Sequence, residues 1–127
     1  MRYADTLMAP LPRTPRLMDR AKTAVFLAVR EHDSRLTTVA RKLGLGSRTL
    51  QRRLREDGST YQSLLGQVRE QLAKQYLREG DKPLSEIAYR LGFGHATEFH
   101  RAFRNRTGTT PGRFRNGNVS GGPSFPP

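Results

Sequence analysis

Basic and amide side chains recur in this chain at a spacing that would suit the reading of DNA. Arg48, Gln51 and Arg52 lie at positions i, i+3 and i+4, so a helix would carry them on one stripe. Arginine can donate two hydrogen bonds to guanine O6 and N7, and glutamine can pair in the same bidentate way with adenine N6 and N7. These three residues are therefore predicted to contact base edges. The alternative is that the stripe is an ordinary solvated helix face.

A second stripe consists of Thr97, Glu98 and Arg101, and Arg101 matches Arg52 at an offset of 49 residues. The threonine methyl group can contact the methyl group of thymine, and the glutamate can accept a hydrogen bond from cytosine N4. Glu98 can equally form a surface ion pair with Arg101, which follows it by one helical turn. Both interpretations of Glu98 stay open. The stripe as a whole is predicted to face DNA.

Residues beside the two stripes are expected to contact the DNA backbone, because guanidinium and hydroxyl groups are common donors to phosphate oxygens. His100 lies on the flank of its helix, where a structural role is expected rather than a phosphate contact. His95 is expected to cap the start of the same helix. The predicted phosphate contacts are Ser47, Arg53, Arg55, Arg104 and Arg106.

Both stripes belong to an internal repeat, which is the most informative feature of the sequence. The offset between the copies is 48 residues and becomes 49 after the glycine turn. Each copy predicts a helix, a tight turn at Gly44 or Gly92, and a second helix, which is the helix-turn-helix pattern. Thr37 and Ser85 are expected to cap the first helix of each copy. The matching apolar pairs are Leu36/Leu84, Val39/Ile87, Ala40/Ala88, Leu43/Leu91, Leu45/Phe93, Leu50/Phe99 and Leu54/Phe103.

Further helical segments complete a predicted all-α fold of about seven helices. Apolar residues recur at helical spacing over 17–32 and over 60–79, and residues 111–115 form a last short helix. The 60–79 segment would be a long linker helix between two helix-turn-helix subdomains. The predicted organisation is a linker or remnant of an upstream sensor domain (1–16), a first subdomain (17–58), the linker helix (59–80), a second subdomain (81–115) and a disordered tail (116–127).

Composition restricts the partners and the chemistry. With 23 lysines and arginines against 11 acidic residues, the net charge of +12 favours a polyanionic partner. The chain has no cysteine, which excludes disulfides, thiolate metal sites and the nucleophilic thiol of DNA repair methyltransferases. No enzyme activity, cofactor or metal is expected, and no apolar run is long enough for a membrane span. We predict a cytoplasmic protein that binds double-stranded DNA. A non-specific basic nucleic-acid-binding protein is the alternative.

The second copy also carries a family signature. Residues 91–93 (Leu-Gly-Phe) form its turn, and residues 99–104 (Phe-His-Arg-Ala-Phe-Arg) lie in its second helix. Residues 108–115 then supply a Gly-x-Thr-Pro segment followed by Phe-Arg. Over about residues 17–115 the chain resembles the DNA-binding part of the AraC/XylS family of bacterial transcription regulators. Residues 47–54 are similar to the first recognition helix of that family.

The resemblance implies a seven-helix module that contacts two adjacent major grooves and usually activates transcription by touching RNA polymerase. It also implies an upstream sensor and dimerisation domain in a longer protein, with this chain monomeric by itself. A stand-alone small activator of the same family is the alternative. Arg106 departs from the family pattern, which frequently has an aromatic residue there. By position, the family's base readers correspond to Arg48, Gln51 and Arg52, and to Ala96, Thr97, Glu98 and Arg101.

Overall fold

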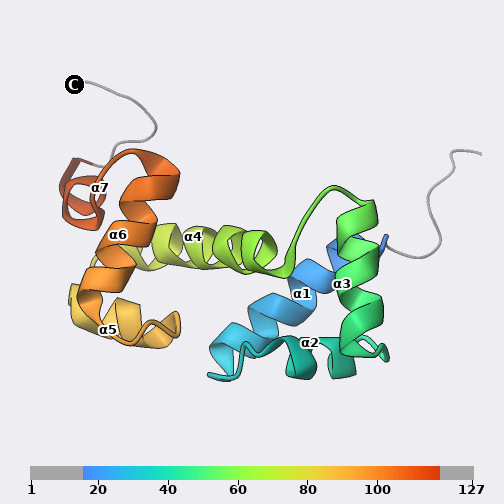
Figure 1. Ribbon diagram of the computed structural model, residues 1–127. Coiled ribbons are helices and arrows are strands. Elements are labelled where there is room, and N and C mark those ends of the chain that lie inside the picture. Colours follow the sequence, from blue (N-terminus) through green and yellow to red (C-terminus); the bar gives the residue numbers. More distant parts are fainter. Residues whose placement is uncertain (1–15, 118–127) are drawn as a thin grey trace, which may run out of the picture.

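A computed structural model describes residues 16–117, and within this range the chain forms seven α-helices and no strand (Figure 1). This confirms the predicted all-α class, with two helix-turn-helix units joined by a long helix. The helices are α1 (Leu17–Arg30), α2 (Leu36–Lys42), α3 (Ser47–Glu56), α4 (Tyr61–Glu79), α5 (Leu84–Arg90), α6 (Ala96–Thr107) and α7 (Pro111–Gly117).

The two terminal segments of the predicted organisation fall almost entirely outside the described residues. At the N-terminal side only Arg16 is described, and it precedes α1 in an extended conformation. At the C-terminal side α7 continues to Gly117, so the helix extends two residues into the segment that was predicted as a tail.

Helix α4 is the rod on which both helix-turn-helix units are built (Figure 1). In the first unit, α1 packs on α4, and α2 packs on both α1 and α3. In the second unit, α6 and α7 pack on α4, and α5 packs on α6. The second helix of each unit, α3 or α6, therefore stands at its own end of α4.

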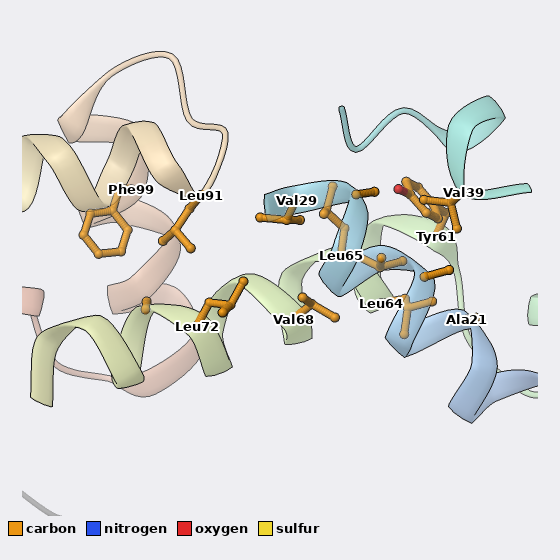
Figure 2. Close-up of a cluster of buried hydrophobic side chains, with 14 of the residues drawn as sticks. Ala21, Val29, Val39, Tyr61, Leu64, Leu65, Val68, Leu72, Leu91 and Phe99 are labelled. Carbon is orange, nitrogen blue, oxygen red and sulfur yellow. The ribbon is translucent and has the colours of Figure 1, made fainter. Parts of the chain in front are cut away.

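One continuous hydrophobic core runs along α4 and serves both units. Figure 2 shows Leu64 and Leu65 directed at α1 and Leu72 directed at the side of α5 and α6. Leu72 is 2% exposed and Val68, which lies between the two ends, is 3% exposed. Because burial of apolar area is the main source of stability, the two units are held by the same helix and by the same core.

The turn of each unit requires a left-handed backbone that glycine supplies. Gly44 has φ of 72° and Gly92 has φ of 90°. Both follow the C-cap residue of a short helix, where this conformation ends a helix without a Cβ penalty. The two turns predicted from the repeat are confirmed.

The predicted caps of α2 and α5 are wrong. Thr37 and Ser85 each stand at the second position of their helix, since the N-cap residues are Arg35 and Pro83. A side chain inside the first turn no longer reaches the free backbone N–H groups as a cap does. Thr38 is instead the buried hydroxyl of this region, and it donates a hydrogen bond to the Asp33 carboxylate over 2.8 Å.

The hydroxyl group of Tyr61 joins the start of α4 to the loop between α1 and α2. It donates a hydrogen bond of 2.6 Å to the Ser34 carbonyl, and the Tyr61 side chain is 8% exposed. Burial raises the pKa of Tyr61 to about 12, because the charged phenolate is poorly solvated there.

This pKa predicts a loss of stability in alkali. A folded-state pKa above the ordinary value of about 10 gives a stabilisation that is complete below pH 10 and is lost as the pH rises through 12. We expect the free energy of unfolding to fall across this window, measured by urea titration at stepped pH. Tyr61→Phe should remove that part of the fall, and the exposed-site control Tyr89→Phe should retain it. An identical pH profile for Tyr61→Phe and the parent would contradict the assignment.

Candidate nucleic-acid interface

Helix α3 separates its side chains into a buried pair and an exposed stripe. Leu50 and Leu54 are completely buried, and they fix which face of the helix meets the core. Arg48, Gln51 and Arg52 are all exposed on the remaining surface. The predicted base readers of the first unit are thus brought together on one accessible helix face.

The other predicted contacts of α3 surround this stripe. Arg53 and Arg55 are exposed, and Ser47 is half-buried at the first position of the helix. Arg52 forms an ion pair of 3.2 Å with Glu56 one turn later, with both side chains more than half exposed. An exposed pair of this kind contributes little to stability, so the guanidinium can leave Glu56 for a DNA acceptor at small cost.

Helix α6 repeats the arrangement with aromatic residues. Phe99 and Phe103 are buried, and their rings meet edge to face with centroids 6.0 Å apart. Thr97, Glu98, Arg101 and Arg104 are all exposed. The three predicted readers of this unit, together with a predicted phosphate contact, therefore lie on its accessible surface.

The predicted cap of α6 by His95 is wrong, and the Glu98 carboxylate binds the turn that precedes the helix. His95 is the N-cap residue, but its side chain makes no capping hydrogen bond. The Glu98 carboxylate instead accepts a hydrogen bond of 3.1 Å from the backbone N–H of Gly94. A glutamate in the first turn also interacts favourably with the helix dipole. Within residues 16–117, no ion pair joins Glu98 to Arg101.

Arg106 lies between α6 and α4. Its Nε donates a hydrogen bond of 2.9 Å to the Glu70 carboxylate, which also pairs with Lys74 over 3.0 Å. Partial burial raises the pKa of Glu70, but the hydrogen bonds from Arg106 and Lys74 outweigh burial and leave that pKa below its usual value. Gly66 leaves room for the contact, because a Cβ there would lie 2.8 Å from Nη1 of Arg106. Its predicted phosphate contact stays a prediction.

Arg69 is a residue of this region that sequence reasoning missed. Its Nε donates a hydrogen bond of 2.9 Å to the Leu91 carbonyl, and its guanidinium carbon lies 4.5 Å from the centre of the Phe93 ring. Burial lowers the pKa of Arg69, although arginine stays charged in proteins. The available signal was an arginine that interrupts the apolar stripe of α4, between Leu65 and Leu72.

Comparison with known proteins identifies the fold family. A family model described as a helix-turn-helix domain matches residues 39–117, from within α2 to the end of α7. The match covers more than half of the chain. The chain belongs to the AraC/XylS family. Within residues 16–117 of this AraC-family chain, no helix is both long and apolar enough to cross a membrane.

Its curated relatives are bacterial regulators of greater length. The AraC-family chain is 46% identical over 80 residues to the ornithine utilization regulator of Pseudomonas aeruginosa. The aligned stretch covers 63% of this chain and 24% of that protein. It is 37% identical over 81 residues to the transcriptional activator RhaS of Citrobacter koseri, and this aligned stretch covers 63% of the chain and 29% of RhaS. The matched stretch is therefore less than a third of each of these relatives.

Solved structures of similar size match more completely. A DNA-binding transcriptional dual regulator from Escherichia coli K-12 has a TM-score of 0.76 and 25% identity, covering 84% of this AraC-family chain and 96% of its own. The DNA-binding domain of AdpA, solved in complex with a target DNA, has a TM-score of 0.63 and 27% identity. The match covers 77% of this chain and 91% of the AdpA domain.

The contact between Arg106 and Glu70 predicts an energetic coupling between α6 and α4. We expect Glu70→Gln and Arg106→Gln each to lower the free energy of unfolding. The double variant should lose about 1 kcal/mol less stability than the two single losses added together. Urea denaturation of the four proteins measures this. The matched control is the more exposed Arg52–Glu56 pair, for which a coupling of roughly 0.3 kcal/mol is expected. Equal coupling in the two pairs would show that Arg106 does not brace α6.

Proposed function

We propose that this chain binds double-stranded DNA sequence-specifically through α3 and α6, and that it regulates bacterial transcription. The observation that carries the proposal is the paired architecture of the two helices. Each buries two apolar residues four positions apart and leaves Arg52 or Arg101 exposed between them at the matching position. A recognition helix needs this division, because one face must dock on the domain while the other enters the major groove.

The length of α4 supports the use of two successive major grooves. The helix has 19 residues, which at 1.5 Å per residue corresponds to roughly 28 Å. Half-sites on one face of duplex DNA are about 34 Å apart. Helices α3 and α6 stand near opposite ends of this rod (Figure 1), and this arrangement supports their use in two successive grooves.

The roles proposed for α3 follow from donor geometry. Arg48 and Arg52 donate to guanine O6 and N7, and Gln51 pairs with adenine. Arg53 and Arg55 contact the flanking phosphates, together with the hydroxyl of Ser47.

In α6, Arg101 reads a guanine and Thr97 contacts a thymine methyl, while Arg104 meets the backbone. Ala96 presents only a methyl group, which limits direct readout at the start of this helix. The carboxylate of Glu98 already accepts a hydrogen bond from the Gly94 N–H, which competes with a role in base reading.

The comparisons support a role in transcription. RhaS of Citrobacter koseri is named a transcriptional activator, and the AdpA domain was solved on a target DNA. We infer that this chain acts as an activator, with RNA polymerase as a protein partner and the bacterial cytoplasm as its location. Because the matched stretch is the smaller part of the curated relatives, we also propose an upstream sensor half that brings dimerisation to the longer protein.

Substitution of the central arginines should reduce sequence discrimination. We expect Arg52→Ala and Arg101→Ala each to cost about 1–3 kcal/mol of binding free energy on the cognate site and to relax preference at the base pairs they contact. The controls Arg55→Ala and Arg104→Ala should weaken binding to all DNA alike. They should also make the dependence of log affinity on log salt concentration shallower, by the amount that about one phosphate contact contributes. Fluorescence anisotropy with cognate and scrambled duplexes at several salt concentrations measures both effects.

The cognate site comes from selection of bound duplexes out of a random library, followed by footprinting. Two protected major-groove patches one helical turn apart are expected. The net charge of +12 alone favours non-specific binding. If the selection enriched no sequence, and if Arg52→Ala and Arg101→Ala weakened all duplexes equally, non-specific binding would be the function.

A further inference from the structure

The two recognition helices share one register when residues are counted from their N-caps. Helix α3 has Gly46 as its N-cap residue and α6 has His95, so the caps are 49 residues apart. The buried pairs follow the same offset, at the fourth and eighth helical positions of each helix. Positions that are equivalent in this count therefore point in equivalent directions relative to the core.

In this register Gln51 corresponds to His100, and not to Glu98. Gln51 and His100 both occupy the fifth helical position, next to the central arginine at the sixth, and both are exposed. The third helical position is occupied by Thr49 in α3 and by Glu98 in α6.

The side chain of Glu98 is already engaged at the start of its own helix. Its Oε1 accepts from the Gly94 N–H over 3.1 Å. A Cβ built on Gly94 would lie 3.5 Å and 4.0 Å from the two carboxylate oxygens, so the whole group lies over the turn before α6. By contrast, the His100 side chain is exposed, and its ring makes no hydrogen bond to any of residues 16–117.

We propose that His100, and not Glu98, is the base-reading neighbour of Arg101 in the second unit. This inference rests on the proposed DNA-binding function. An imidazole N–H can donate to guanine N7 or O6, so the base pair beside the one read by Arg101 carries a guanine. Glu98 instead positions the turn that precedes α6, through its hydrogen bond from the Gly94 N–H. The second unit then reads bases with the second, fifth and sixth positions of α6, which are Thr97, His100 and Arg101. The first unit uses the same three positions of α3, which are Arg48, Gln51 and Arg52.

The test compares base preferences of single variants. The parent protein first selects its site from a random duplex library. Affinities are then measured for the site and for every single base-pair change in the half-site protected by α6. We expect His100→Ala to lose about tenfold in affinity for the parent site and to lose preference at one base pair only. We expect His100→Gln to shift the preference at that pair toward adenine.

The matched control is Glu98→Ala on the same helix. It should lower the midpoint of thermal unfolding and leave the preference at every base pair as in the parent. Circular dichroism verifies that each variant remains helical. A loss of preference in Glu98→Ala, or an unchanged profile in His100→Ala, would overturn the assignment while leaving the DNA-binding function in place. A uniform loss on all duplexes in His100→Ala would make it a phosphate contact and also overturn the assignment. If the parent selected no sequence, both this inference and the proposed function would fail.

Discussion

Burial of one apolar stripe on α4 is the constraint on which the rest of the molecule depends. Val68 lies near the middle of that stripe, between the residues that meet α1 and those that meet α5 and α6 (Figure 2). Neither unit can withdraw from α4 without exposing apolar surface that the other unit helps to cover. The distance between α3 and α6 is therefore set by a single helix, and a shared core makes that distance a property of the whole fold.

Polar contacts attach the two units to α4 in different ways. The first unit is joined through the Tyr61 hydroxyl at the start of the helix. The second unit is joined through charged groups of the helix itself, with Arg69 on the Leu91 carbonyl and Glu70 on Arg106. The second unit thus ties one arginine of its recognition helix, Arg106, to α4, whereas within residues 16–117 no arginine of α3 bonds to α4.

The two recognition helices differ accordingly in what they present. Helix α3 exposes long donors at every position of its stripe, while α6 begins with Ala96 and Thr97 and has Glu98 bonded to the turn that precedes it. A short or engaged side chain reaches less far into a groove than an arginine does. Sequence discrimination should therefore rest more heavily on the first unit.

Local periodicity was enough to predict the helices, because a buried pair such as Leu50 and Leu54 or Phe99 and Phe103 is separated by one turn of the same helix. The glycine turns and the family were readable for the same reason, since their signals lie within a few residues. Contacts across the chain were not readable: Arg69 meets Leu91 and Arg106 meets Glu70 across 22 and 36 residues. Only the packing of α4 decides that these groups meet, because sequence spacing carries no information about which distant side chains the folded core brings within hydrogen-bond distance.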